Sequence, residues 1–286
     1  MTITRLLWLT ALTLGPATAA NIDFSVSSSP TFRVGVSDLT LLGGAVGLGL
    51  SNRAVDASFS NGLDLSVAGT LQAGISAAYA FGSGFRLGAN ANGTLGPIAV
   101  NAALGYWTTG VANVDPLAVW DEAGTPITAR GALASLNARY RLSRALVLSG
   151  TGVLGPQNTV AAGVEYRMGS AGSATLRGGL RGGDGVFGLT AGVSLPVTDS
   201  ATLSADALLG PHSLGLTGSL NLADALGDGS NLRAYAAYEP WRSDALPLRV
   251  GAVAALPTGP GTLTLDVAGG TGGLGARAAY SLPLGQ

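Results

Sequence analysis

Side chains that commonly carry acid–base, nucleophilic or metal chemistry are scarce in this sequence. It has one histidine, His212, and no cysteine. His212 could serve as a base toward Ser213 or Ser219, but neither serine stands in a recognisable nucleophile motif, and a histidine in a hairpin turn explains the same pattern. One histidine without cysteine is also a poor metal-binding set. We therefore predict no enzymatic activity, no metal site and no cofactor.

Two other segments superficially resemble ligand sites. The glycine cluster 178–185 (GGLRGGDG) lacks the lysine and the following helix that a phosphate-binding loop needs, so we interpret it as a hairpin turn. Asp115, Asp121 and Glu122 could hold a cation within segment 108–131. A solvated loop accounts for these acids more simply.

Arginine is the most prominent charged residue type. All 15 basic residues are arginine, balanced by 16 acids to a net charge of −1, so no overall field favours nucleic acid. Inside the amphipathic segments the charges fall on the alternate positions that large apolar residues avoid. The charges that we predict to line the interior are Arg86, Arg139, Glu165, Arg167, Arg177, Arg181, Asp206, Arg233, Arg249, Asp266 and Arg277.

The composition differs from that of a soluble enzyme. Charged residues make up 11% of the chain, against roughly 25% in ordinary soluble domains. There are 45 glycines, and the mean hydropathy is +0.40. These values suit a protein with apolar surface to place outside a core.

The N-terminus predicts export. One arginine precedes the apolar run 6–15, and Ala17-Thr-Ala19 fits a small-residue cleavage site. We interpret residues 1–20 as a secretory signal peptide, which is too short to span a bilayer. The mature chain, 21–286, contains no apolar run long enough for a transmembrane helix.

Hydrophobicity alternates with period two along almost all of the mature chain, which predicts strands joined by tight turns. The predicted strands are 22–27, 30–37, 44–50, 54–59, 63–69, 71–81, 85–95, 97–107, 132–142, 145–154, 158–168, 173–181, 185–195, 201–209, 212–222, 231–239, 246–256, 261–268 and 274–282. Residues 63–81 could form one strand, and the first segment could belong to the second, so we expect 16 or 18 strands. The long gap, 108–131, is a loop or a constriction folded into the interior.

The apolar face could meet either a second sheet or lipid. A β-sandwich would alternate in the same way, but glycine also recurs on the apolar face, where it would leave voids in a core. The strand-end aromatics point to lipid. Tyr79, Phe81, Phe85, Tyr106, Phe187 and Tyr238 map to one rim, and Tyr140, Tyr166 and Tyr280 map to the other. Two aromatic girdles mark a transmembrane β-barrel.

The signal peptide, the amphipathic strands of about ten residues and the tight turns resemble a Gram-negative-type, porin-like outer-membrane β-barrel. The likeness covers 21–286 and rests on pattern rather than on a motif. It implies an all-β fold, a single transmembrane antiparallel up-and-down barrel of about 16–18 strands in the outer membrane. It also implies the lipid bilayer and the barrel-assembly machinery as partners. The family commonly ends in an aromatic residue, whereas this chain ends in Gln286.

Three functions remain open at this point. A passive, weakly selective channel for small solutes fits an interior lined by small residues. A structural envelope barrel without transport, docked to surface-layer or envelope proteins, is the first alternative. A secreted soluble β-sandwich that binds a partner is the second.

Two details of the interior can be predicted from hairpin register. Glu165 can lie opposite Arg177, and Asp266 opposite Arg277, which would neutralise charge within the interior. Arg139, Arg167, Arg177 and Arg181 fall on neighbouring strands. They could form an arginine ring that favours anions, or an ordinary wall of ion pairs.

Overall fold

The computed structural model describes residues 20–27, 31–122, 125–169, 173–211, 213–241 and 247–284. The predicted signal peptide lies outside the described residues except for Ala20. His212 and Gln286 also lie outside them.

The described chain is almost entirely strand. Three short 3₁₀ turns interrupt it: η1 (Ser66–Ala68), η2 (Val111–Asn113) and η3 (Pro116–Trp120). None of the helical segments in the described ranges is long and apolar enough to cross a membrane. The strands are β1 (Ala20–Ser27), β2 (Thr31–Leu41), β3 (Gly44–Ser51), β4 (Ala54–Asp64), β5 (Gly69–Ala80), β6 (Gly84–Leu95), β7 (Ile98–Trp107), β8 (Gly131–Arg141), β9 (Leu146–Leu154), β10 (Thr159–Arg167), β11 (Thr175–Gly183), β12 (Gly188–Thr198), β13 (Ala201–Gly210), β14 (Ser213–Ala223), β15 (Asn231–Tyr238), β16 (Leu248–Thr258), β17 (Gly261–Gly270) and β18 (Gly273–Leu284).

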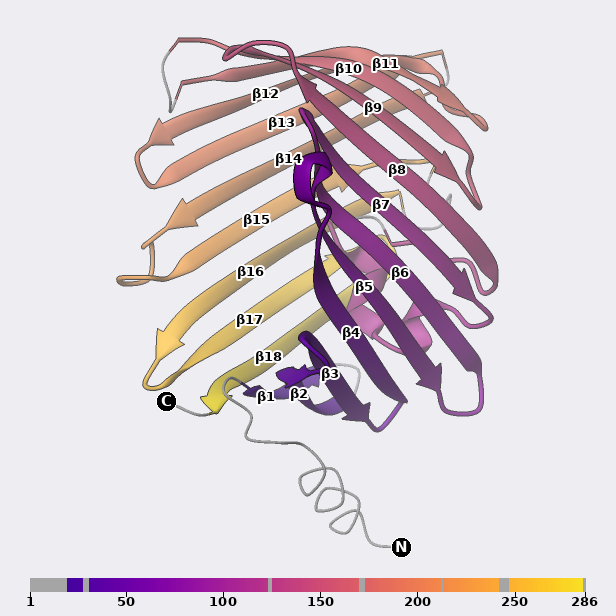
Figure 1. The fold of residues 1–286 in the computed structure, drawn as a ribbon, viewed down its shortest axis with the longest axis vertical. Coiled ribbons are helices and arrows are strands. Elements are labelled where there is room, and N and C mark those ends of the chain that lie inside the picture. Colours follow the sequence, from indigo (N-terminus) through magenta and orange to yellow (C-terminus); the bar gives the residue numbers. More distant parts are fainter. Residues whose placement is uncertain are drawn as a thin grey trace, which may run out of the picture.

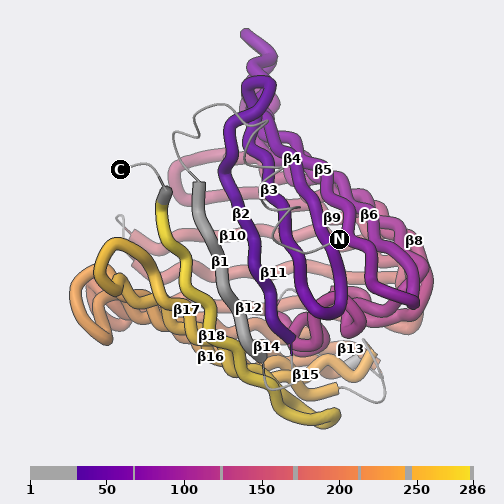
Figure 2. Tube along the Cα trace, turned by 90° about the horizontal axis from the view of Figure 1, so that it is seen from below, coloured from indigo at the N-terminus to yellow at the C-terminus, as the bar shows by residue number. Residues whose placement is uncertain are grey.

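These 18 strands form one closed antiparallel ring. Each strand pairs with the strands before and after it in the chain, and β1 pairs with both β2 and β18. Figure 1 shows the consecutive strands side by side, and Figure 2 shows indigo β2 and yellow β18 on the same side of the ring. Closure leaves no unpaired edge, which a sheet in lipid requires. The predicted up-and-down barrel is confirmed, with the larger of the two expected strand numbers.

The sequence pattern predicted 19 segments, and the region 54–81 accounts for the difference. Segments 54–59 and the start of 63–69 form the single strand β4, because Asn61 and Gly62 stay extended and pair with Ala73 and Gln72. The turn falls later, at 65–68, where Ser66 has a positive φ of 57° and its N–H donates to Asp64 Oδ1 over 2.8 Å. The idea of one strand over 63–81 is therefore wrong. The idea that the first segment belongs to the second is also wrong, because β1 and β2 are separate strands.

The ring has an apolar outer face and a polar inner face. In β11, Leu176 and Leu180 alternate with Arg177 and Arg181. Large apolar side chains on the outer face are exposed, as Leu104 is at 61%. A soluble sandwich would bury this face against a second sheet. The ring leaves it on the outside, so the sandwich interpretation is wrong.

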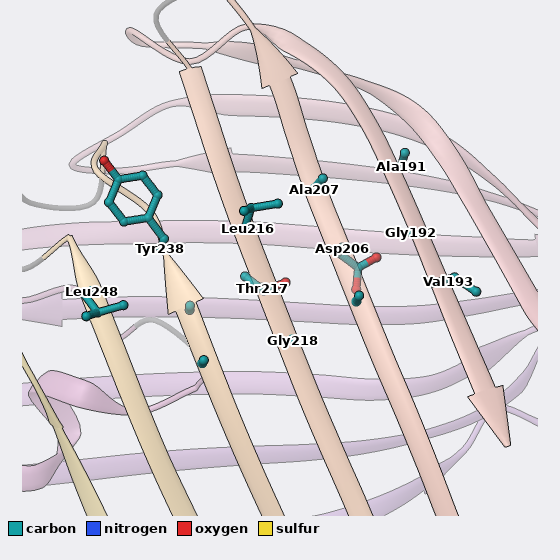
Figure 3. A pocket seen from close by; sticks show the side chains of 13 residues that line it. Ala191, Gly192, Val193, Asp206, Ala207, Leu216, Thr217, Gly218, Tyr238 and Leu248 are labelled. Carbon is teal, nitrogen blue, oxygen red and sulfur yellow. The ribbon is translucent and has the colours of Figure 1, made fainter. Parts of the chain in front are cut away.

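A shallow depression of about 610 Å³ lies on the outer face of β12–β16. Figure 3 shows it close up, with Ala191, Ala207, Leu216, Tyr238 and Leu248 contributed by five neighbouring strands. Small and apolar side chains make up most of its lining, which also includes Asp206 and Thr217. The alanine, valine and leucine side chains are compatible with lipid chains, since none of them needs a hydrogen bond there.

Aromatic side chains gather at both rims of the ring. Odd-numbered strands end, and even-numbered strands begin, at the rim that carries the β7–β8 connection, which we call the loop rim. The first predicted girdle lies there, and Phe32, 61% exposed at the start of β2, joins it. Tyr140, Tyr166 and Tyr280 lie near the opposite rim, where β1 begins and β18 ends, which we call the termini rim. The two predicted girdles are confirmed.

Candidate functional site

The connection between β7 and β8, residues 108–130, enters the interior of the ring. We call it the inner loop. It leaves Trp107 on one wall and contacts β16, β17 and β18, which lie seven to nine strands from β7 around the ring, on the opposite wall. Figure 1 shows its helical turns in magenta, enclosed by the strands. This path fits the second of the two alternatives expected for the segment, and its action as a constriction stays a prediction.

The sequence of the inner loop explains its local shape. Pro116 opens η3, where its fixed φ suits a first helical position. Asp115 caps the turn, because its Oδ1 accepts a hydrogen bond from Leu117 N over 3.1 Å. Val111 and Leu117 are buried, and the two 3₁₀ turns that carry them contact each other. The loop is therefore a folded element rather than a solvated tether.

Polar contacts fix the tip of the inner loop to the opposite wall. Arg277 of β18 forms an ion pair with Asp115, and Arg233 Nη2 of β15 lies 2.6 Å from Glu122 Oε1. The Tyr235 hydroxyl donates to the Trp120 carbonyl over 2.6 Å. Charge-assisted bonds of this kind are stronger than neutral ones. Of the acids that could have held a cation, Asp115 and Glu122 thus anchor the loop, whereas the Asp121 carboxylate accepts hydrogen bonds from Thr125 within it.

Arg249 of β16 is the most deeply buried of these anchors. Its residue is 2% exposed. One guanidinium nitrogen donates to the carbonyls of Asp121 and Glu122, and another pairs with the Glu239 carboxylate. A buried guanidinium must be neutralised and hydrogen-bonded to be tolerated. Arg249 therefore couples the inner loop to the β15–β16 connection.

The base of the inner loop is held as well. Trp107 is 3% exposed, and its Nε1 donates to the Thr128 carbonyl over 2.9 Å. The Arg86 guanidinium lies 5.0 Å from the centre of the Trp107 ring, and its Nη1 donates to Thr109 O over 2.9 Å. A cation over an indole face is favourable by about 0.5–2 kcal/mol. Both ends of the crossing are thus fixed.

Cavities remain on both flanks of the inner loop. One, of about 320 Å³, lies against β2–β4 and is lined by Arg33, Asp56, Asp115 and Arg277. The other, of about 160 Å³, lies against β13–β16 and includes Glu122, Asp206, Glu239 and Arg249. Both are polar and carry charges of both signs. The loop therefore narrows the interior and leaves water-sized space on either side of it.

Ion pairs on the inner wall join strands two positions apart. Arg33 of β2 pairs with Asp56 of β4 at 2.8 Å, and Arg177 of β11 binds Asp206 of β13 through two bonds of 2.8 Å. Gly192 of β12 lies beneath the second pair, and a Cβ there would collide with the Asp206 carboxylate. Arg139 of β8 pairs with Glu165 of β10 in the same way. The long arginine side chains thus reach across the intervening strand to a carboxylate on the strand beyond it.

The predicted hairpin registers are confirmed, but the ion pairs differ from those expected. Glu165 lies opposite Arg177, and Asp266 lies opposite Arg277. Glu165 nevertheless pairs with Arg139, while Arg177 turns to Asp206. Because the arginine side chain is long, it can pair with a better-placed carboxylate than the one directly opposite it in the hairpin.

The eleven charges predicted to line the interior occupy strand positions that alternate with outward apolar residues, and their role in lining a passage stays a prediction. The four arginines considered as a ring do not share one site. Arg177 is paired with Asp206, and Arg181 lies 5.5 Å from the Trp241 ring centre near the loop rim. Arg139, which is paired with Glu165, and Arg167 line one cavity at the termini rim.

Sequence reasoning missed several inner-face residues. Arg33 alternates with Phe32 and Val34, so the same parity rule would have found it. Tyr235 shares the parity of Arg233, but the other strand tyrosines face outward, so the residue type points to the wrong face. Arg141, at the end of β8, shares the parity of Arg139, so the same rule would have found it as well. Arg144 and Trp241 lie outside the strands, where parity gives no guide.

No protein-family model matches the chain, and no curated protein matches it. Among solved structures it is similar to variants of the porin of Rhodopseudomonas blastica. One variant shares 11% sequence identity at a TM-score of 0.49, covering 93% of this chain and 98% of that one. A structure from work on the asymmetric conductivity of engineered proteins gives 12% identity at the same TM-score and coverage. Values this low describe overall shape and carry no residue-level or functional correspondence.

Proposed function

We propose that the protein is a passive, weakly selective channel for small solutes. The observation that carries the proposal is the inner loop, which is fixed at both ends and has polar cavities on both flanks. A ring of 18 strands encloses more space than its own small inner-face side chains fill. A loop held across that space limits the size of what passes.

Weak selectivity follows from the balance of charge near the inner loop. The acids that line the two cavities beside it are each ion-paired with an arginine, either in the same cavity or on the adjoining wall. A passage lined by neutralised pairs exerts little net field on an ion. Size, more than charge, then decides which solutes pass.

The location and partners belong to the same proposal. We place the barrel in an outer membrane, exported by the signal peptide 1–20 and inserted by the barrel-assembly machinery. The outward apolar band and the two aromatic girdles support a bilayer as its solvent. No catalytic role is part of the proposal.

Swelling of proteoliposomes tests the solute range. Vesicles that contain the folded protein should admit small neutral sugars and exclude large ones, with a gradual cut-off. Vesicles with an equal amount of heat-unfolded protein serve as the control. Equal impermeability to every sugar would reject a channel for small solutes.

A structural barrel is the second candidate, and the density of anchors on the inner loop favours it. A loop fixed this firmly could close the passage and leave the outer face and the rims as the functional surfaces. Folded protein in vesicles that stay closed to the smallest sugars would support this second candidate.

A further inference from the structure

A group of arginines lies at the termini rim, away from the inner loop. A cavity of about 270 Å³ there is lined by Arg139, Arg141, Arg144, Arg167 and a single acid, Glu165. The arginines come from the end of β8, the β8–β9 turn and the end of β10. We call these four residues the rim arginines.

The rim arginines carry unbalanced positive charge. Glu165 pairs with Arg139, and within the described ranges no carboxylate forms an ion pair with Arg141, Arg144 or Arg167. The neighbouring residues 170–172 are Ser, Ala and Gly, which add no charge. This contrasts with the cavities beside the inner loop, where every lining carboxylate is ion-paired with an arginine. Excess positive charge in a concave site attracts anions.

The backbone beneath the rim arginines is well fixed. Ser143 Oγ accepts hydrogen bonds from Ala145 N and Leu146 N, at 3.2 and 3.1 Å. Arg167 N donates to Ala145 O over 2.8 Å, which ties β10 to the turn. The Arg141 side chain donates from Nε to Ser143 O over 3.3 Å. The guanidinium groups therefore project from one braced corner of the ring.

We propose that the rim arginines bind a phosphate-type oxyanion at the mouth of the barrel. A planar guanidinium presents two parallel donors that match two phosphate oxygens, and several such forks can share one dianion. Arg139, Arg141 and Arg167 have the inner-face parity, opposite to Tyr140 and Tyr166. This placement favours a free phosphate or phosphate monoester in the interior over a lipid headgroup.

Binding of inorganic phosphate can be measured by calorimetry on the full folded chain in a phosphate-free maltoside detergent at low salt. The triple variant Arg141→Gln, Arg144→Gln, Arg167→Gln should bind at least about tenfold more weakly. Arg130→Gln, which removes an exposed arginine outside the cluster, should stay within about twofold of wild type. Unchanged affinity in the triple variant, or no saturable binding by the wild type, would overturn the proposal.

A second variant guards against misfolding of the triple substitution. Arg144 lies in an exposed turn, so Arg144→Gln alone should fold normally and still weaken phosphate binding by about threefold. Folding is checked by the gel mobility of unheated samples. An Arg144→Gln protein that folds and binds phosphate as wild type does would count against the site.

Two further measurements address the source of the anion and its role in transport. Phosphate affinity should be equal in vesicles of phosphatidylcholine and in vesicles that also contain phosphatidylglycerol. Loss of binding in the latter would show that headgroups occupy the arginines and would overturn the free-anion assignment. The channel readout alone rests on the proposed function: phosphate added from the termini side should lower a chloride current. Calorimetry still decides the binding question if no current exists.

Discussion

At the residue scale, the inner face is organised by arginines that reach across a neighbouring strand. Gly192 shows how, because only a residue without a Cβ leaves room for the Arg177–Asp206 pair above it. Gly49 has the same role beneath Arg33 and Asp56. Some of the glycines therefore leave room for ion pairs on the inner face, while others form turns.

The anchors of the inner loop differ in burial, which predicts different costs of removal. Arg249→Ala should lower the free energy of unfolding by about 3 kcal/mol, because it leaves the Glu239 carboxylate and two loop carbonyls without their donor. Arg233→Ala, at an ion pair that is about half exposed, should cost less than about 1 kcal/mol.

Urea unfolding in detergent micelles, followed by tryptophan fluorescence, measures both variants under the same conditions. Equal, small losses for the two substitutions would mean that the buried contacts of Arg249 do not hold the loop.

Side-chain parity predicted which charges share the inner face but not which of them pair. Arg277 lies opposite Asp266, as the hairpin register predicts, yet its ion-pair partner is Asp115, which is remote in the sequence. Pairing depends on where the inner loop lies and on which strand has a glycine. Both are properties of the assembled ring.

At the element scale, each strand separates an outward apolar row from an inner row. Leu104→Arg, near the middle of β7, should destabilise the folded barrel in a bilayer by about 2–4 kcal/mol, since a charge on the lipid face is costly there. Ala103→Arg changes the inward-facing residue just before Leu104. This substitution should cost less than about 1 kcal/mol because water can reach the guanidinium.

Refolding into phosphatidylcholine vesicles at graded urea, scored by heat-modifiable gel mobility, compares the two variants. A larger loss for Ala103→Arg than for Leu104→Arg would reverse the assignment of the faces.

The presence of the strands was predictable because amphipathic alternation persists along the chain. Some of the strand boundaries were not predictable. Asn61-Gly62 has the residues of a tight turn, yet the pairing of β4 with β5 keeps it extended. Similarly, the residues of 108–130 predicted a loop with acids and prolines. Its path to the opposite wall depends on Arg233, Arg249 and Arg277, which are distant in the sequence.

At the scale of the whole molecule, closure of the ring joins the first strand to the last. Ser25 of β1 lies opposite Ala279 of β18. The chain contains no cysteine, so a pair of introduced thiols reports on this contact alone. Ser25→Cys with Ala279→Cys should form a disulfide in the folded protein, since opposed strand residues lie within bonding range.

Non-reducing gel mobility before and after mild oxidation detects the cross-link. Ser25→Cys with Ala268→Cys places the second thiol on β17, which does not pair with β1, and should remain reduced. Cross-linking of this control pair to the same extent would argue against the β1–β18 register.

Single-channel recording in planar bilayers tests the central claim, that the ring is an open passage narrowed by the inner loop. Folded wild-type protein, confirmed by gel mobility, should give discrete and reproducible conductance steps with a small reversal potential in a salt gradient. Folded protein that inserts but stays electrically silent would contradict the account.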